Sequence, residues 1–170
     1  MTTAYGLHHS EYIAFLHSLR SRQLLYSSLR SSTQEGKVKL CIFTNAPKAY
    51  GCKVLETLHI REYFDDENIF GVDDVMKFGV CKPEPLAFNK VLEGVGCTEP
   101  SKAVMFEDSM KNVRAAKAVG MRTCFIVANP DLHDVGDRPD EGDENVDVVL
   151  RDIGQMREML SCLWRAEWDF

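Results

Sequence analysis

The stretch AVMFEDSMKNVRAAKAVGMRTCFIV, residues 103–127, decides the fold class of this chain. It begins with the apolar run 103–106, continues through a helical segment at 110–119 that Gly120 can end, and closes with the run 122–127. Short apolar runs are typical of strands buried on both faces of a parallel sheet, and glycine is favoured just beyond the end of a helix. The stretch therefore predicts a strand, a helix and a second strand.

The same alternation continues on both sides of this unit. Further strands are predicted at 38–43, 69–72 and 146–150, and further helices at 45–58, 85–95 and 153–164. Strands that alternate with helices at this spacing indicate a parallel sheet with right-handed crossovers. We therefore predict an α/β core over residues 35–170 and a separate helical segment over residues 1–34.

Composition excludes several functional classes. The chain has 170 residues and a formal net charge of −6, which argues against a nucleic-acid-binding face, because phosphate backbones require clustered lysine and arginine. No apolar run approaches the length of a membrane span. The six cysteines form no Cys-x-x-Cys pair, so neither a zinc site nor a redox dithiol is indicated.

The N-terminal segment leaves two interpretations of localisation open. Residues 10–33 contain Arg20, Arg22 and Arg30, many serines and a single acid, Glu11. This composition suits an organelle transit peptide. The alternative is a helix that folds with the domain. We expect a cytoplasmic protein, with organelle import as the alternative.

Acidic residues dominate the segment 129–147, where hydrophobic periodicity fails. Its aspartates recur at every third position, at Asp131, Asp134, Asp137, Asp140 and Asp143. Hard cations such as calcium bind clustered carboxylates, but no EF-hand spacing is present. We expect a solvated acidic loop.

Five polar residues at the ends of predicted elements are the candidate site. Thr44 and Asn45 follow the strand 38–43, and Glu107 and Asp108 end the strand at 103–106, where parallel sheets place their ligands. Lys82 precedes a helix that begins with proline. Each also has a purely structural interpretation, because Asn45 and the acids can cap the following helices and Lys82 can be a surface lysine.

Together these residues suit phosphoryl transfer. The Thr44 hydroxyl and the Asn45 backbone N–H can bind a phosphoryl oxygen, and the Lys82 ammonium can neutralise the phosphate. Asp108, assisted by Glu107, can hold Mg²⁺, which takes one or two carboxylates and keeps part of its hydration shell. A small phosphorylated metabolite is the expected ligand.

The order of these motifs resembles that of the haloacid dehalogenase (HAD) superfamily of phosphohydrolases. FTN at 43–45, CKP at 81–83 and FEDS at 106–109 are similar to its second, third and fourth motifs. The resemblance implies a three-layer, Rossmann-like parallel sheet, phosphate monoester hydrolysis and Mg²⁺ as the metal. It also implies that residues 1–34 are the remnant of a helical cap domain or a linker.

Three longer segments of the sequence look most like the pyrimidine 5′-nucleotidase branch of this superfamily. These segments are FTNA at 43–46, DSMKN at 108–112 and AAKAVGMRT at 115–123. This branch implies a nucleoside monophosphate substrate. Glu107 departs from the pattern, because an acid pair at this position is also common in sugar-phosphate phosphatases and mutases.

The first motif of the family, Asp-x-Asp-x-Thr or -Val, supplies the nucleophile and ends the first, central strand. This chain contains no two aspartates separated by one residue. Two hypotheses follow. The chain is either most of a HAD phosphohydrolase that is active only in a longer form, or a non-catalytic chain that binds phosphate, Mg²⁺ or a partner strand. In both cases we expect no turnover by the chain as given.

The absence of this motif also predicts how far apart the two flanking strands lie. In the family, the first strand lies between the strand ending at Thr44 and the strand ending at Asp108. We expect a vacant strand position there, with the flanking strands roughly 9–10 Å apart, because neighbouring strands lie about 4.8 Å apart. The alternative is direct pairing of the two flanking strands.

Overall fold

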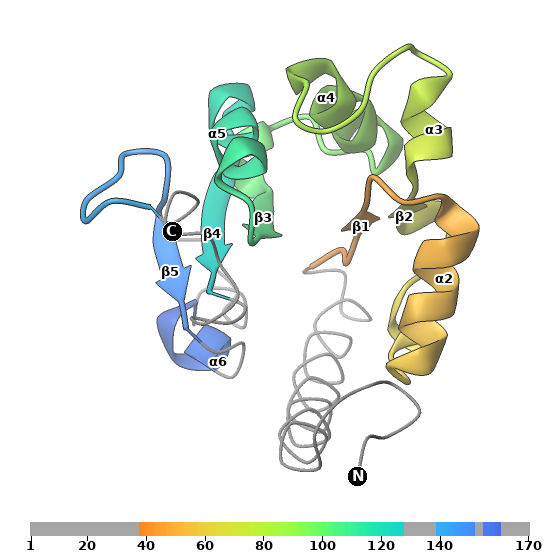
Figure 1. Ribbon diagram of the computed structural model, residues 1–170, viewed down its shortest axis with the longest axis horizontal. Helices are drawn as coiled ribbons and strands as arrows, with labels where there is room; N and C mark the ends of the chain where they lie inside the picture. The colour runs from red at the N-terminus through yellow and green to blue at the C-terminus, as the bar shows by residue number, and fades with distance from the viewer. Residues whose placement is uncertain (1–37, 128–138, 152–154, 161–170) are drawn as a thin grey trace, which may run out of the picture.

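The computed structural model describes residues 38–127, 139–151 and 155–160 of the chain (Figure 1). Its strands are β1 (Ile42–Phe43), β2 (Ile69–Phe70), β3 (Val104–Glu107), β4 (Arg122–Ile126) and β5 (Val148–Leu150). Its helices are α2 (Lys48–Thr57), α3 (Val72–Met76), α4 (Pro85–Gly94), α5 (Met110–Val119) and α6 (Met156–Met159), with 3-10 turns at Arg61–Tyr63, Asp66–Asn68 and Pro100–Lys102.

The described strands form two parallel sheets. β1 pairs with β2, placing Ile42 opposite Ile69. The other sheet has the order β3-β4-β5, with Val104 opposite Arg122 and Cys124 opposite Val148. Strand alternates with helix along the chain, so the predicted α/β class with a parallel sheet is confirmed.

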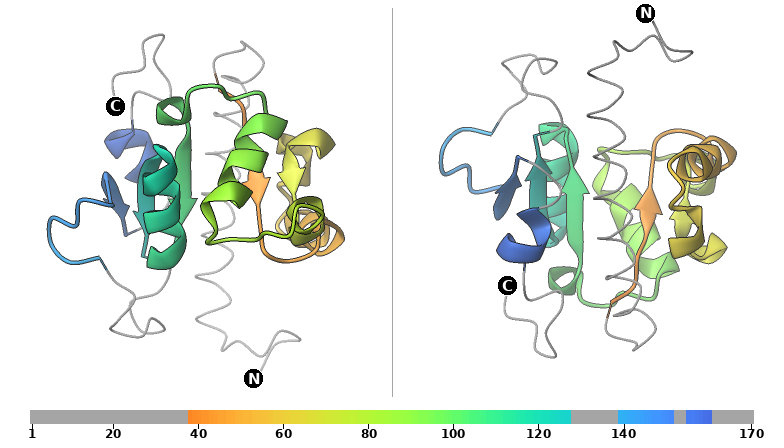
Figure 2. Two further views of the ribbon diagram at one scale, coloured as in Figure 1. Left: turned by 90° about the horizontal axis from the view of Figure 1, so that it is seen from above. Right: turned by 90° about the horizontal axis from the view of Figure 1, so that it is seen from below.

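Helices cover both faces of the larger sheet. α5 lies on one face and α6 on the opposite face, which gives three layers (Figures 1 and 2). Phe125 of β4 is fully buried and packs with Val113 of α5. α4 lies beside α5 and joins the two sheets, because its Phe88 contacts Phe43 of β1 and belongs to the same cluster as Met105 of β3.

Most predicted elements of the core are present, with shorter strands. α4 and α5 match their predicted spans to within one residue, and Gly120 ends α5 with a φ of +96°. The strand predicted over 38–43 is confined to Ile42–Phe43. The sequence missed α3, a five-residue helix. The predicted segment 1–34, the aspartates at 131, 134 and 137, and residues 161–164 lie outside the described residues.

β1 and β3 are not hydrogen-bonded to each other. Within residues 38–127, 139–151 and 155–160, each of the two strands has a single ladder partner, β2 for β1 and β4 for β3. The direct pairing considered as the alternative is therefore wrong. Figure 2 shows both strands running the same way, with α4 over the space between them.

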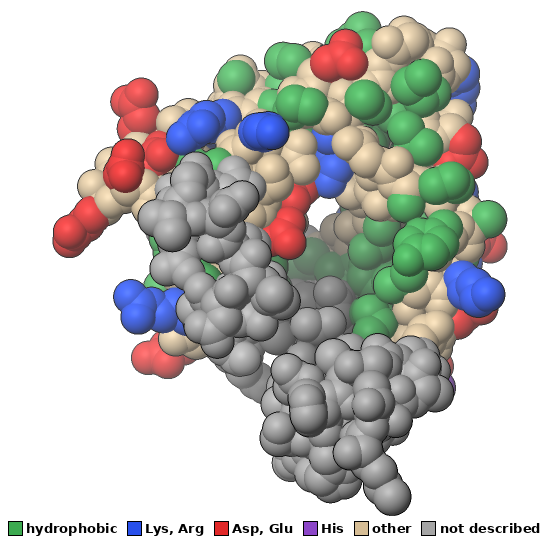
Figure 3. Space-filling view, viewed as in Figure 1, with side chains coloured by type: hydrophobic (Ala, Val, Ile, Leu, Met, Phe, Trp, Pro, Cys, Tyr) green, Lys and Arg blue, Asp and Glu red, His purple; other side chains and the backbone are tan. Residues whose placement is uncertain are grey.

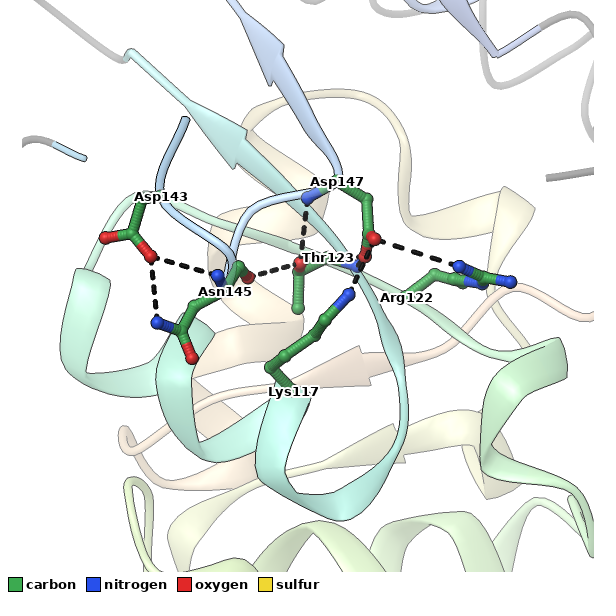
Figure 4. Close-up of polar contacts among 6 residues, drawn as sticks. All are labelled: Lys117, Arg122, Thr123, Asp143, Asn145 and Asp147. Atoms are coloured by element: carbon green, nitrogen blue, oxygen red, sulfur yellow. Dashed lines mark hydrogen bonds and ion pairs between the residues drawn. The ribbon is translucent and has the colours of Figure 1, made fainter. Parts of the chain in front are cut away.

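The described part of the acidic segment is anchored to the sheet (Figure 4). Asp147 accepts hydrogen bonds from the Thr123 backbone N–H at 2.8 Å and the Thr123 hydroxyl at 3.1 Å, and pairs with Lys117 at 2.6 Å. Thr123 is fully buried. The Asp143 carboxylate accepts from the Asn145 backbone and side chain at 2.9 and 2.8 Å. Asp143 and Asp147 are thus tied to neighbouring residues, whereas Asp140, Glu141 and Glu144 of the same segment are exposed, as expected of a solvated loop.

The turn between β1 and α2 packs directly against the start of α3. The Lys48 backbone N–H donates to Asp73 at 2.7 Å, and Val72 N–H donates to Ala46 O at 2.9 Å. Gly71 lies in this contact, where an added Cβ would meet the Lys48 backbone nitrogen and lie 2.6 Å from the Lys48 Cα. Only a residue without a side chain fits there.

No helix in the described part of the chain is both long enough and apolar enough to cross a membrane. The five cysteines that the structure describes are free thiols. Burial raises the pKa of the Cys124 thiol to about 12. Cys124 is thus an inert core residue rather than a reactive thiol.

Replacing Gly71 by alanine should destabilise the fold by about 1–3 kcal/mol, because the new methyl overlaps backbone atoms that cannot move aside. Gly51→Ala is the matched control. Its Cβ meets only the Thr44 methyl at 3.4 Å, and alanine is favoured over glycine inside α2 by about 0.5–1 kcal/mol. Urea denaturation should show a lower midpoint for Gly71→Ala alone. Equal midpoints would contradict the tight contact.

Asp147→Asn should lower stability at pH 7 by about 1–2 kcal/mol, because hydrogen bonds to a charged group are lost. Burial opposes ionisation of Asp147, but Lys117 and the Thr123 bonds outweigh it and hold its pKa below the usual range. A depressed pKa stabilises the fold above the unfolded value of about 3.9, and this contribution is lost as pH falls through the folded value.

The difference between wild type and Asp147→Asn should therefore shrink on acidification. Urea unfolding at pH 7 and pH 3 measures it. Glu141→Gln, in an exposed position of the same segment, is the control that removes one charge without touching the cluster. A difference that is the same at both pH values would show that the charge of Asp147 is not responsible.

Candidate functional site

Thr44 and Asn45 form the turn that follows β1. The Thr44 N–H continues the β1–β2 ladder by donating to Phe70 O at 3.0 Å. Its hydroxyl oxygen accepts from the Ala46 N–H at 3.1 Å, the local bond expected of threonine in a turn. The turn thus places a hydroxyl and successive backbone N–H groups at the carboxyl end of β1.

The Asn45 side chain binds the backbone of Lys82, 37 positions away in the sequence. Its amide nitrogen donates to Lys82 O at 2.9 Å, and its oxygen accepts from the Lys82 N–H at 3.1 Å. The prediction that Asn45 caps α2 is wrong, because Pro47 occupies the N-cap position and no side-chain bond caps the helix. Asn45 instead fixes Lys82 beside the end of β1.

Lys82 is a buried cation. Its Nζ lies 2.8 Å from Glu107 Oε2, and both side chains are 9% exposed. The same Nζ lies 5.3 Å from the centre of the Phe43 ring, within range of a cation–π contact. The alternative of a solvated surface lysine is wrong. The Lys82 side chain bridges the two sheets, from the end of β1 to the end of β3.

Glu107 uses both carboxylate oxygens within the protein. Oε2 accepts from Lys82, and Oε1 accepts from the backbone N–H groups of Asp108 at 3.2 Å and Ser109 at 3.3 Å. Burial opposes its ionisation, but hydrogen bonds from Asp108 and Lys82 and the Lys82 charge hold its pKa below the usual range. Glu107 is therefore an ionised partner that holds Lys82 in place.

Asp108 is the exposed member of the acid pair. The space-filling view shows a hollow near the centre of the molecule (Figure 3). Acidic and basic side chains border this hollow. No group of three or more histidine, cysteine, aspartate or glutamate residues suited to a metal occurs within the described residues. Magnesium needs only one or two protein carboxylates when phosphate and water supply the other ligands, and Asp108 fits that requirement.

All five residues proposed from the sequence lie in one connected region. Asn45 contacts Lys82, and Lys82 contacts Glu107. Thr44 directly precedes Asn45 in the sequence, and Asp108 directly follows Glu107. The sequence did not identify Phe43 as a partner of the Lys82 ammonium. Its position next to Thr44 in an apolar strand gave no sign of a contact with a cation.

Comparison with known proteins identifies the family. The family model for haloacid dehalogenase-like hydrolases matches residues 2–120, well over half of the chain. The chain belongs to the haloacid dehalogenase-like hydrolases. The superfamily resemblance carried by the three motifs is confirmed. The chain is also similar to proteins named as phosphatases.

Two curated relatives are phosphatases of phosphorylated small molecules. The chain is 36% identical over 93 residues to the phosphorylated carbohydrates phosphatase of Thermotoga maritima, covering 55% of this chain and 40% of that protein. It is 30% identical over 124 residues to the validoxylamine A 7′-phosphate phosphatase of Streptomyces hygroscopicus subsp. limoneus, covering 73% and 52%. The chain thus spans about half the length of these relatives or less.

A solved structure agrees with the fold. The HAD phosphatase from Thermococcus onnurineus superposes with a TM-score of 0.60 at 32% identity, covering 79% of this chain and 55% of that one. The three-layer HAD-like architecture expected from the motifs is therefore confirmed.

Lys82→Met should destabilise the protein by about 3–5 kcal/mol at pH 7, because it leaves the Glu107 carboxylate buried without its partner. The double variant Lys82→Met/Glu107→Gln should recover much of this loss, since no uncompensated charge remains. Urea denaturation of wild type, both single variants and the double variant gives the coupling energy.

The same pair predicts a pH dependence. Because the pKa of Glu107 is lowered on folding, its contribution is present above the unfolded value of about 4.3 and is lost as pH falls through the folded value. The stability of wild type should therefore decline more steeply on acidification than that of the double variant. Parallel profiles, or additive single variants, would show that the two charges are not coupled.

Proposed function

We propose that this chain carries the phosphoryl-binding part of a HAD phosphatase site. The observation that supports it is the buried Lys82 ammonium, fixed by the Asn45 amide and Glu107 at the carboxyl ends of β1 and β3. A lysine held this way is a fixed point charge of the kind that binds a phosphate group. The polar Thr44–Asn45 turn is joined to Lys82 by the two hydrogen bonds of the Asn45 side chain.

Each residue has a separate task in this proposal. An ammonium carries three N–H donors, of which Glu107 accepts one, so Lys82 can still donate to a phosphoryl oxygen. The Thr44 hydroxyl and the Asn45 N–H donate to another oxygen. Glu107 acts through Lys82, because its own oxygens are already engaged. Donors held in place before the substrate binds stabilise developing charge without reorganisation.

Asp108 is the residue proposed to hold Mg²⁺. When bound, the ion would act as a Lewis acid on the phosphoryl oxygens. Glu107, which the sequence suggested as an assisting ligand, is committed to Lys82 and to backbone N–H groups. We therefore assign it to the positioning of Lys82 rather than to the metal.

The substrate class proposed is a small phosphorylated metabolite, with sugar phosphates ahead of nucleoside monophosphates. The names of the two curated phosphatases support phosphorylated carbohydrates and related compounds. The acid pair at 107–108 supports the same choice. The motif details that look like the pyrimidine 5′-nucleotidase branch keep nucleoside monophosphates as the second candidate.

Turnover requires a nucleophile that none of these residues supplies. Lys82, Thr44 and Asp108 only stabilise charge around an attack by another group, and the chain contains no Asp-x-Asp pair. The chain is therefore proposed to bind phosphate and to hydrolyse phosphate esters only when a carboxylate nucleophile is supplied. A non-catalytic phosphate-binding or partner-binding role is the alternative.

The chain as given should bind inorganic phosphate but show no turnover above background with glucose 6-phosphate, phosphoglycolate, cytidine monophosphate or p-nitrophenyl phosphate in the presence of Mg²⁺. Phosphate titration followed by ³¹P NMR measures binding. The double variant Lys82→Met/Glu107→Gln, which keeps the buried site neutral, should bind at least about tenfold more weakly, the loss expected for one charge-assisted hydrogen bond.

Lys53→Met is the matched control, since it makes the same substitution at an exposed position of α2 and should leave binding unchanged. Phosphate binding that survives in the double variant would refute the assignment of the site. Robust turnover that Asp108→Ala abolishes would refute the need for a supplied nucleophile.

A further inference from the structure

The proposed function does not use one contact of Lys82, its contact with the aromatic ring of Phe43. The Lys82 Nζ lies over this ring, 5.3 Å from its centre, within the range of about 6 Å over which a ring face attracts a cation. The Lys82 side chain is only 9% exposed. Because water screens little at such a position, the attraction is stronger than at the surface. Phe43 is therefore a second partner of the buried ammonium, beside Glu107.

The Phe43 ring is itself held in one orientation. Its backbone belongs to the β1–β2 ladder. Its ring packs edge to face with Phe88 of α4, with the ring centres 5.5 Å apart and the ring planes at 89°. Phe88 is fully buried, and Phe43 also packs against the buried cluster that contains Val80 and Val91. The ring thus cannot turn away from Lys82 without disrupting the packing of α4.

The ring supplies a constraint that the hydrogen bonds of Lys82 do not. Both bonds of the Asn45 side chain go to the Lys82 backbone, so they place the residue but not its ammonium. Glu107 accepts one of the three N–H groups of the ammonium at 2.8 Å. This bond fixes one direction at Nζ, and the flexible four-carbon stem still lets the ammonium rotate about it. The face of the Phe43 ring restricts that rotation, and with it the direction of the remaining N–H groups.

Phe78 makes the same kind of contact at the surface. Its ring centre lies 5.4 Å from the Lys77 Nζ and 4.9 Å from the Lys90 Nζ, and Phe78 is 48% exposed. Cation–π contacts at exposed positions are weaker than those from which water is excluded. Phe78 is therefore a matched reference within the chain, with a similar ring and similar cations in different surroundings.

We propose that Phe43 is a positioning residue for phosphate binding, because its ring face holds the Lys82 ammonium in the orientation that binds a phosphoryl oxygen. This role rests on the proposed function, which makes Lys82 the phosphate-binding cation. The attraction between a charge and a ring quadrupole falls steeply with distance, so the ring acts on the ammonium beside it rather than on the phosphate. When this attraction weakens, the competent orientation becomes less populated, and the apparent affinity for phosphate falls by the same fraction.

Fluorinated phenylalanines at position 43 test this role, since fluorine withdraws charge from the ring face and changes the shape of the side chain little. Para-fluorophenylalanine and 3,4,5-trifluorophenylalanine, each incorporated at this one position of the full chain, weaken the cation–π contact in steps. Titration with inorganic phosphate followed by ³¹P NMR should show an affinity that falls in the same order. The trifluorinated ring should lower it by at least about fivefold, within the range expected for a desolvated contact.

Two further measurements separate positioning from packing. The same two fluorinated residues at position 78 weaken the contacts of Lys77 and Lys90, yet should leave phosphate affinity unchanged, because neither lysine belongs to the proposed site. The ¹³C relaxation of the Lys82 Cε reports side-chain motion without any phosphate, and it should show greater motion in the trifluorinated protein than in wild type.

Three outcomes would overturn the role of Phe43 alone. Equal phosphate affinity across the position 43 series would mean that only the shape of the ring matters. Equal losses at positions 43 and 78 would reveal a general effect of fluorination, and unchanged Lys82 motion would exclude positioning. Wild type that binds no phosphate would overturn the proposed function, and this role with it. The monofluorinated residue, the smaller change, keeps the test decisive if the trifluorinated chain does not fold.

Discussion

The Lys82–Glu107 ion pair is the interaction on which the geometry of the site depends. Asn45 fixes its cation at the end of β1 and its anion ends β3, so the pair joins two strands that share no backbone ladder. A buried ion pair is stable only when further hydrogen bonds satisfy its members. Here the Asn45 amide and the N–H groups that follow Glu107 supply them. The cation is therefore held rigidly where two strand ends converge.

The sequence predicted the elements whose signals are local. The apolar run before Glu107, the periodicity of α5 and the left-handed Gly120 are set by neighbouring residues, and the structure reproduces them. It also predicted which side chains gather at the sheet edge, because parallel strands bring their carboxyl ends together. It missed α3, since five residues carry too little periodicity to show a helix.

The sequence did not predict contacts between residues that lie far apart along the chain. The Asn45 side chain could bond either to the start of α2 or to the Lys82 backbone. The sequence around Asn45 is compatible with both, and the packing of the two turns against each other selects Lys82. Asp147 belongs to an acidic segment that looks solvated, yet Thr123 and Lys117 come from β4 and α5 to bind it. In both cases the partner lies more than 20 positions away, where no local pattern reports it.

Among the described residues, side chains rather than a backbone ladder join β1 to β3. The Lys82–Glu107 pair joins their carboxyl ends, and Phe88 of α4 contacts Phe43 and belongs to the same cluster as Met105. A side-chain link holds its geometry only while the packing around it holds, because side chains can change rotamer and a ladder cannot. The position of the Lys82 ammonium therefore depends on the packing of α4 against both sheets as well as on its two hydrogen-bond partners.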